Sequence, residues 1–600
     1  MNEKKLPELL APAGSPAALR AALRAGADAV YLGAGSFNAR VNAKNFSLEA
    51  LPDAVAEAHE AGAKLYLTLN TLVYDREMRD WLATAEAAYL AGVDALIVAD
   101  LGGAMALRRT FPDLPLIRKH IPDLELHAST QMSGHNVAAA RRLAALGFER
   151  MVLARELSAK NIAEFCKNSP IEAEVFVHGA LCVCHSGQCL FSSIVGGRSG
   201  NRGECAQPCR LPYTTAQGKG YPLSLKDLTL AAHLPSIIDA GVASLKIEGR
   251  MKAPEYVATV TSVWRTLLDE RRAANEREMR YLADVFSRSG FTDAYYTESI
   301  SRKMLGVRTD SDKAKSGASG NAKAKTITRT SLPTRADGGS RAAAYEKCAP
   351  VGKRSRTKTA YFSSPRQYTA AAQKFFDLAF IPVELHGAAV REGIRFDGVA
   401  LPPVIPDSER AEVKNLLLSA KRAGATHALV GNVGHIDLAT EVGLIPHGDF
   451  RLNVCNAESA AAVEKLGFAD FILSPELTLP RIRDIGGDSR VIVYGRLPLM
   501  ITEKCVGKEC GSCRDCELGK ACLTDRMGKK FPVLRVFRHR SMIVNCLPTY
   551  MGDSSAELRA AGIAGEHYIF TVEAPREVDR VINARSKNAP IGECRRIAKK

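Results

Sequence analysis

The sequence predicts an α/β protein with a TIM-like (β/α)₈ barrel at the N-terminus, a basic flexible linker and a second, partial barrel-like domain. Three observations predict this order. Short apolar segments alternate with helical segments over the first 300 residues. A polar, basic stretch follows, and a second alternating region then repeats part of the first. We place the domains at 1–300, 301–358 and 359–555, with a C-terminal segment at 556–600.

The strands expected in the first region are short and mostly apolar, as is typical of parallel strands covered on both faces. The helices between them repeatedly end in glycine, the common C-cap signal. About eight such units fit a (β/α)₈ barrel, with a doubly wound open sheet as the alternative. The barrel is favoured because no glycine-rich dinucleotide fingerprint follows a strand. The expected strands lie in PELLAPAG, ADAVYLGA, AKLYLTLNTLV, DALIVAD, ELHASTQ, RMVLARE, AEVFVHG and GVASLKIEG.

The linker is the most basic part of the chain. Arg302–Lys358 contains 15 Lys+Arg and 4 Asp+Glu, with few large apolar residues. This composition predicts a loosely ordered segment. Because basic segments attract phosphate backbones, a nucleic-acid contact and a solvated linker remain equal alternatives.

The second alternating region indicates an internal duplication. Ala140–Leu157 aligns with Ala461–Leu477, and Val175–Cys182 aligns with Val491–Met500. In each copy, a cysteine-rich loop follows the second of these aligned segments. We favour a true duplication over generic similarity between βα units.

The first cysteine loop, at 178–210, begins where the segment EVFVHG ends. In a barrel this is the C-terminal face, where such folds place their active sites. Clustered thiols in a reducing compartment favour metal binding over disulfides, and four of them suit either an iron–sulfur cluster or zinc. Arg198, Arg202 and Arg210 add positive charge that would favour thiolates or hold an anionic substrate. A zinc knuckle that only stabilises the loop is the alternative.

The second cysteine loop, at 505–522, contains the spacing C-x₂-C-x₂-C. This spacing resembles ferredoxin-type ligation, although zinc ribbons also use C-x₂-C. We expect a metal or cluster here too, with zinc as the stronger alternative at this loop. The expected ligands are Cys505, Cys510, Cys513 and Cys516.

The eighth expected strand carries a candidate group for acid–base work. Lys246, Glu248 and Arg250 alternate in the sequence, so in a strand they would project to one side, near the first cysteine loop. Three charged groups on one face suit proton transfer or anion binding. A buried ion-pair network that closes the barrel is the alternative. His178 ends the seventh strand beside the loop, in either a functional or a core role.

Several classes of protein are disfavoured because the sequence lacks their characteristic features. The N-terminus has no apolar stretch of the secretory type, and no run reaches the roughly 18 apolar residues that span a bilayer. We therefore expect a cytoplasmic protein. The signatures H-E-x-x-H, G-x-S-x-G and the P-loop are also missing from the sequence.

Several long motifs, in order, resemble the peptidase U32 family, whose members were historically described as collagenase-like proteases. The resemblance covers nearly all of residues 6–300 and is closest to the RNA-hydroxylating branch. In the second half it rests on YGRLPLMITEKC and LTDRMGKKFPV. The first-half motifs are LLAPAGSPAALRAALRAGADAVYLGAGSFNAR, NFSLEALPDAVAEAHEAGAKLYLTLNTLVYDREM, EVFVHGALC, SGQCLFSS, RSGNRGECAQPCR and SLKIEGRMKAPEY.

The resemblance implies an enzyme that hydroxylates a pyrimidine in rRNA or tRNA, with prephenate as oxygen source or co-substrate. It implies a [4Fe–4S] cluster held by Cys182, Cys189, Cys205 and Cys209. Cys184 and His185 depart from the family motif, and the linker is shorter than the folded module of long members. A peptidase and a zinc-binding, non-catalytic assembly factor remain the competing interpretations.

Overall fold

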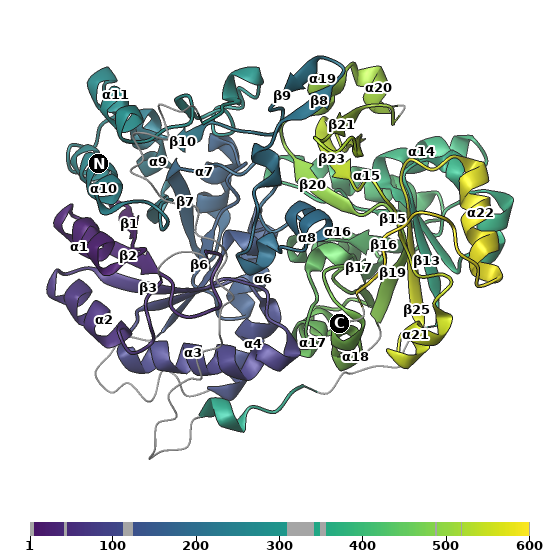
Figure 1. Cartoon of the computed structure of the whole chain (residues 1–600), viewed down its shortest axis with the longest axis horizontal. Helices are drawn as coiled ribbons and strands as arrows, with labels where there is room; N and C mark the ends of the chain where they lie inside the picture. Colours follow the sequence, from purple (N-terminus) through teal and green to yellow (C-terminus); the bar gives the residue numbers. More distant parts are fainter. Residues whose placement is uncertain are drawn as a thin grey trace. The chain divides into compact units, whose positions relative to one another are not determined.

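The computed structural model describes residues 5–40, 45–111, 124–308, 341–348, 356–485, 489–517 and 519–598. The chain divides into two compact units, each built around its own barrel (Figure 1). The first unit comprises Met1–Gly187, Arg198–Leu211 and Tyr221–Glu346, and the second comprises Gln188–Gly197, Pro212–Gly220 and Lys347–Lys600.

The first unit contains a closed barrel of eight parallel strands, which confirms the predicted fold. The sheet closes because β11 pairs with both β1 and β7. All eight strands coincide with the segments expected from the sequence. They are β1 (Glu8–Pro12), β2 (Ala29–Leu32), β3 (Lys64–Leu69), β4 (Ala95–Val98), β5 (Glu125–Ala128), β6 (Arg150–Val152), β7 (Glu172–Gly179) and β11 (Ser244–Ile247).

Helices follow most of these strands and bury their apolar faces against the sheet. Gly92 ends α3 in a left-handed conformation, as its place in the sequence predicted. β10 (Asp227–Thr229) pairs antiparallel with the end of β7 and in parallel with β12 (Phe291–Thr292). The helices are α1 (Pro16–Arg24), α2 (Leu51–Glu60), α3 (Met78–Ala91), α4 (Leu101–Thr110), α6 (Val137–Ala145), α7 (Ala159–Asn168), α9 (Leu234–Ala240), α10 (Pro254–Asp269) and α11 (Glu276–Val285).

A buried ion network fills the lumen of the first barrel. Lys246 Nζ lies 2.6 Å from Glu174 Oε1, and Arg150 Nη1 lies 3.5 Å from Glu174 Oε2 and 2.7 Å from Glu8 Oε1. Lys246 is 3% exposed and Glu174 is fully buried. Because buried charges must be paired, each charge here depends on its neighbours. The structure therefore places Lys246 in a buried ion-pair network that closes the barrel, which was the alternative to a role in acid–base chemistry.

The second unit contains a complete barrel rather than the partial one expected. β25 lies between β13 and β19 and closes the sheet, so residues after 556 belong to this barrel and not to a separate C-terminal segment. Apolar side chains of β25 are needed to complete the core. The strands are β13 (Lys358–Phe362), β14 (Leu378–Pro382), β15 (Gly398–Ala400), β16 (His427–Val430), β17 (Ile445–Gly448), β18 (Phe471–Ile472), β19 (Ser489–Gly495) and β25 (Gly565–Phe570).

Helices also surround this barrel, and β24 (Thr549–Tyr550) pairs antiparallel with β19, as β10 does with β7. The helices are α13 (Ala370–Phe375), α14 (Val383–Arg391), α15 (Arg410–Arg422), α16 (Ile436–Glu441), α17 (Ala457–Lys465), α18 (Leu479–Ile485), α21 (Ser555–Ala560) and α22 (Pro575–Ser586).

Local details support the predicted duplication. Ser133 and Asn453 occupy equivalent turns and both have φ of 55°. Asn136 and Asn456 then cap equivalent helices with their side chains. The register between the seventh and eighth strands shifts at the same place in both barrels. Shared irregularities of this kind indicate common descent more strongly than shared strand order does.

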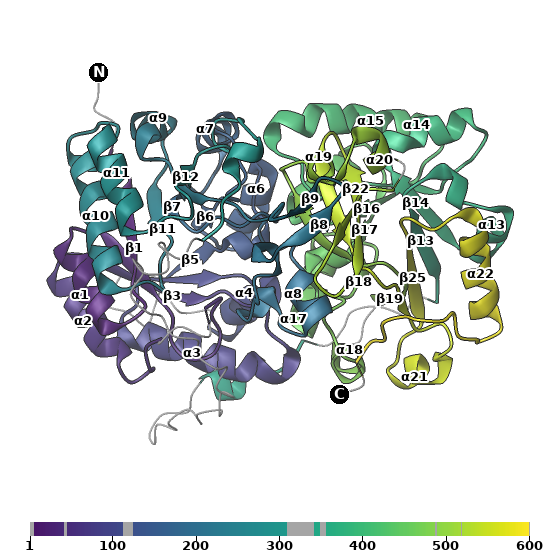
Figure 2. The ribbon, with the colours of Figure 1, turned by 45° about the horizontal axis from the view of Figure 1, so that its top comes forward.

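Two segments from the first half of the chain belong to the second unit: Gln188–Gly197 of the first cysteine loop, and Pro212–Gly220, which follows that loop. One contains α8 (Phe191–Gly196), and the other contains the hairpin of β8 (Tyr213–Thr215) and β9 (Gly218–Gly220). The hairpin joins an antiparallel sheet, through β21, within that unit (Figure 2). The rest of that sheet is β20 (Pro498–Thr502), β21 (Cys522–Thr524), β22 (Lys530–Val536) and β23 (Arg540–Val544). The expected boundary at residue 300 is therefore not a clean one.

Most of the basic linker lies outside the described residues. A described part of it, 341–346, contacts the first barrel, where Arg109 Nη2 donates to the carbonyl oxygen of Glu346 at 2.9 Å. Within the described residues, no helix combines the length and apolarity needed to cross a membrane.

The lumen network makes a stability prediction. Replacing Lys246 with alanine should lower the free energy of unfolding by about 3–5 kcal/mol, because it leaves Glu174 buried beside fewer cations. Lys64→Ala is the matched control, since Lys64 is half-exposed and lies 3.7 Å from Glu125. The control should cost at most about 1 kcal/mol. Urea unfolding measures both, and equal losses would contradict a buried network.

Candidate functional site

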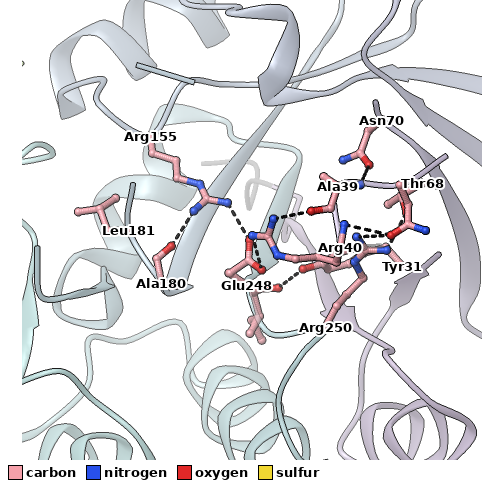
Figure 3. Close-up of polar contacts among 12 residues, drawn as sticks. Tyr31, Ala39, Arg40, Thr68, Asn70, Arg155, Ala180, Leu181, Glu248 and Arg250 are labelled. Atoms are coloured by element: carbon pink, nitrogen blue, oxygen red, sulfur yellow. Dashed lines mark hydrogen bonds and ion pairs between the residues drawn. The ribbon is translucent and has the colours of Figure 1, made fainter. Parts of the chain in front are cut away.

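The C-terminal ends of the first barrel's strands carry a buried carboxylate between two arginines (Figure 3). Glu248 follows β11 directly. Its Oε2 accepts from Arg155 Nη2 at 2.8 Å, and its Oε1 lies 3.2 Å from Arg40 Nη2. Arg155 follows β6 and also donates to the carbonyl oxygen of Ala180 at 2.6 Å. Three strand ends thus contribute one charged cluster.

Arg250 extends this cluster toward β2 and β3. Its Nη1 donates to Thr68 Oγ1 at 2.9 Å and its Nη2 to Asn38 Oδ1 at 3.1 Å. A Cβ atom at Gly33 would lie 2.3 Å from Arg250 Nη1, so only glycine leaves room for this guanidinium. Gly33, in the segment LGAG, therefore makes room for the Arg250 guanidinium.

The charges of this cluster reinforce one another. Burial alone would raise the pKa of Glu248, but Arg40 and Arg155 outweigh it and hold that pKa at about 2. Burial and the charge of Arg40 lower the pKa of Arg250 to about 10. At neutral pH the cluster holds three guanidinium groups and one carboxylate. The surplus positive charge suits an anionic ligand.

The three residues expected on one face are separated by the structure. Lys246 points into the lumen, whereas Glu248 and Arg250 lie beyond the end of β11. Glu248 and Arg250 both belong to the arginine cluster, and Lys246 does not. The prediction treated the three as one continuous strand, but β11 ends at Ile247.

His178 lies at the end of β7 but is only 1% exposed. Its Nδ1 lies 3.2 Å from Thr229 Oγ1, and its ring packs against Phe291 with centroids 5.1 Å apart. Burial and the charge of Lys252 lower the pKa of His178 to about 3, so the ring is neutral. These contacts link β7 to β10 and do not show His178 open to a substrate.

Lys252 is a titratable group that the sequence reasoning did not single out. It follows β11 and lies over the ring of Phe286, with its Nζ 5.3 Å from the Tyr256 ring centroid. Burial lowers the pKa of Lys252 to about 7, and Arg288 and Arg308 act in the same direction, against Asp227. A lysine that is neutral part of the time is suited to accept a proton.

The expected cluster ligands are divided between the units. Cys182, Cys205 and Cys209 belong to the first unit, and Cys189 belongs to a segment of the second. Cys209 is buried, Cys182 is half-buried and Cys205 is exposed. Across the residues that the structure describes, no three His, Cys, Asp or Glu side chains stand arranged as ligands of a metal ion.

Arginines nevertheless accompany these thiols. Arg210 donates to the carbonyl oxygens of Leu181 at 2.6 Å and Leu225 at 2.5 Å. Burial lowers the pKa of Arg210, whereas Cys209 and Cys182 raise it, so the guanidinium and both thiols interact. This is the electropositive setting that favours thiolates.

Arg198 and Arg202, which were predicted to hold an anion, make other contacts in the structure. Arg202 forms a two-pronged ion pair with Glu77, at 2.9 Å for both contacts, and lies over the Tyr74 ring. Arg198 is exposed and donates through Nε to the carbonyl oxygen of Glu204 at 3.0 Å. Arg40 and Arg155 occupy the place that we assigned to Arg198 and Arg202.

Several thiols of the second cysteine loop lie near one another. A Cβ atom at Gly507 would lie 3.1 Å from Cys516 Sγ and 3.7 Å from Cys505 Sγ. Burial raises the pKa of Cys510 to about 12, with added repulsion from Cys522 and Cys516. Cys513 is exposed. The neighbours are therefore Cys505, Cys510, Cys516 and Cys522.

Arg40 and Arg155 carry a signal that could have been found in the sequence. Each follows the C-terminal end of an expected strand, the position where barrel enzymes place their functional side chains. Arg40 ends the segment GSFNAR, and Arg155 lies in RMVLARE.

The arginine cluster makes a prediction about pH. In the unfolded chain Glu248 titrates near 4.5 and in the folded chain near 2, so its contribution to stability is present above about pH 4.5 and lost as pH falls toward 2. Glu248→Gln should cost about 3 kcal/mol at pH 7, and the difference from wild type should shrink in acid. Thermal unfolding from pH 7 to pH 3 measures this difference. A constant difference would contradict the ion pairing.

Comparison with known proteins places the chain in a family. The sequence model of peptidase family U32 matches residues 14–305 and 398–526. The chain is 44% identical over 269 residues to the 23S rRNA 5-hydroxycytidine C2501 synthase of Escherichia coli, covering 44% of this chain and 39% of the relative. It is 40% identical over 285 residues to tRNA hydroxylation protein P1 of Bacillus subtilis, covering 44% and 64%.

A third relative carries a different name. The chain is 34% identical over 316 residues to a collagenase of Porphyromonas gingivalis, covering 48% of this chain and 73% of the relative. The matched part spans 39% and 64% of the two RNA-hydroxylating relatives. The family match includes segments of both barrels, and on this basis the chain belongs to peptidase family U32.

Proposed function

We propose that the chain is an RNA-modifying enzyme that hydroxylates a pyrimidine base, with its reaction centre at the C-terminal end of the first barrel. The observation that carries this proposal is the cluster of Arg40, Arg155 and Arg250 around Glu248. The names of the rRNA and tRNA hydroxylation relatives support the substrate class. The first half of the chain, which contains this cluster, is also the part most fully matched by the family.

We further propose that the cysteine loop holds a [4Fe–4S] cluster through Cys182, Cys189, Cys205 and Cys209. The donor chemistry fits, because all four are thiols and Arg210 interacts with Cys182 and Cys209. Such a cluster, when bound, supplies one-electron transfer. Zinc is the alternative ion for the same thiols.

The arginine cluster suits a small dicarboxylate such as prephenate. A ligand carboxylate would replace Glu248 as the partner of Arg155, whose guanidinium is already oriented by the carbonyl oxygen of Ala180. Two-pronged recognition of carboxylate by arginine supplies both affinity and orientation. Lys252 is the nearby group suited to accept a proton, and the net charge of +16 favours a polyanionic partner.

A peptidase is the second candidate, favoured by the collagenase among the relatives. A thiol peptidase needs an accessible cysteine activated by a histidine. Cys184 and His185 are both buried, and His185 Nδ1 lies 3.7 Å from Glu156 Oε2. This geometry disfavours a catalytic pair at these positions.

Nucleoside mass spectrometry of rRNA and tRNA tests the proposed reaction. A deletion strain should lack one hydroxylated pyrimidine, and the wild-type gene should restore it. Arg155→Met should fail to restore it, because it removes a charged ligand contact. Arg265→Met is the control, since Arg265 only pairs with Asp28 and Asp269 on the surface. An unchanged RNA profile together with measurable proteolysis would establish the peptidase instead.

Anaerobic purification tests the cofactor. The wild-type protein should show broad absorption near 400 nm, typical of iron–sulfur proteins, and Cys209→Ser should remove most of it. Cys166→Ser should leave the spectrum unchanged, because Cys166 lies in α7 of the same barrel and outside the loop. A colourless wild-type protein with stoichiometric zinc would overturn the cluster and favour a non-catalytic zinc protein.

Substitutions also test the metal site that we propose at the second cysteine loop. Cys522→Ser should lower the metal content, measured by mass spectrometry of the intact protein and by elemental analysis, by about one ion or cluster. Cys513→Ser should retain it, because Cys513 is exposed and Cys522 adjoins Cys510. The opposite pattern would support the ligands expected from spacing alone.

A further inference from the structure

The two barrels can be compared position by position at the ends of their strands. A Cβ atom at Gly179 would lie 2.5 Å from the carbonyl oxygen of Glu248, and one at Gly495 would lie 2.5 Å from that of Ile569. Both glycines have positive φ, 106° and 143°. Glu248 of the first barrel therefore corresponds to Ile569 of the second.

Two more positions at the strand ends, that of Arg155 in the arginine cluster and that of Tyr31 on β2, also have apolar counterparts in the second barrel. The alignment that pairs Glu156 with Glu476 places Pro475 at the position of Arg155. Tyr31 and Phe380 lie on the second strands of the two barrels, and each pairs with the first strand at the same level. The strand registers therefore place Phe380 at the position of Tyr31. A carboxylate, a guanidinium and a phenol are thus replaced by apolar groups.

The apolar end of the second barrel is filled by the first cysteine loop. Leu190 is 4% exposed and belongs to the core cluster formed there, and Ile194 of α8 packs against it. The backbone N–H of Leu190 donates to the carbonyl oxygen of Leu499 at 2.8 Å. The cluster contains Phe380, Ala400, Leu429, Phe450, Ile472, Ile492, Leu497 and Ile569.

Aromatic contacts hold the same segment in place. The Phe191 ring lies 5.1 Å from that of Phe531 and 6.3 Å from that of Tyr213, centroid to centroid. Figure 1 draws α8, in the blue of early residues, beside the green elements of the second unit. The residue before Leu190 is Cys189, so an anchored Leu190 restrains a proposed cluster ligand through the chain itself.

We propose that the second barrel is a copy without its own reaction centre, and that its apolar mouth anchors Gln188–Gly197, with Leu190 as the positioning residue for Cys189. The importance of Cys189 rests on the proposed function. The anchoring itself rests only on contacts within the second unit.

Hydrogen exchange on the full-length, cluster-loaded protein tests the anchoring. Leu190→Ala should raise the exchange rate of peptides spanning 188–197 by about tenfold or more, because it removes the side chain that fills the core. Val195→Ala is the matched control on the same helix, since Val195 is 49% exposed, and its exchange should match wild type. Ile194→Ala is a second loosening variant in case Leu190→Ala misfolds.

Two readouts separate this inference from the proposed function. Unchanged exchange in both loosening variants would overturn the anchoring, whatever the RNA result. Faster exchange with undiminished RNA hydroxylation and an undiminished 400 nm absorption would overturn the positioning role. Faster exchange with loss of that absorption supports it, even if the RNA substrate proves to be wrong.

Discussion

Closure of the first barrel by β11 is the constraint on which the site depends. Pairing with β1 and β7 at once carries Lys246 into the lumen, where it meets Glu174, and leaves Glu248 and Arg250 just beyond the end of the strand. The lumen network stabilises the closed sheet from within. The same closure brings Glu248 to Arg155, which follows β6. A single strand thus connects the ion pairs of the lumen with the arginine cluster.

The second barrel has the same framework of strands, but the positions of Glu248 and Arg155 carry no charge there. The lumen pair of Arg150 and Glu174 has a counterpart of reversed sign in Asp470 and Arg490. Paired charge in the lumen has therefore been kept, since an unpaired buried charge is costly. At the strand ends, by contrast, Ile569 and Pro475 stand at the positions of Glu248 and Arg155, and an apolar cluster encloses Leu190.

Much of the fold could be predicted from the sequence, because helical and strand periodicities, glycine caps and the repeat are local signals. The completeness of the second barrel could not, because β25 follows a long stretch of sheet and loop that hides its relation to β13. The residues of the candidate site are only partly visible in the sequence. Glu248, Arg250 and the cysteines stand out as motifs, whereas Arg40 and Arg155 acquire meaning only when β2, β6 and β11 meet. Spacing alone does not report which sulfur atoms lie near one another, so Cys522, whose charge acts on Cys510, was not among the expected ligands.

We propose that the first barrel, and not the second, binds an anionic co-substrate. Calorimetric titration of the holoprotein with prephenate tests it most directly, comparing Arg155→Met with Arg451→Met, a half-buried arginine that follows β17 in the second barrel. Loss of one charged hydrogen-bond pair should weaken binding by about tenfold or more in Arg155→Met. Binding by Arg451→Met should match wild type. Equal weakening in both variants, or wild-type affinity in Arg155→Met, would contradict the claim.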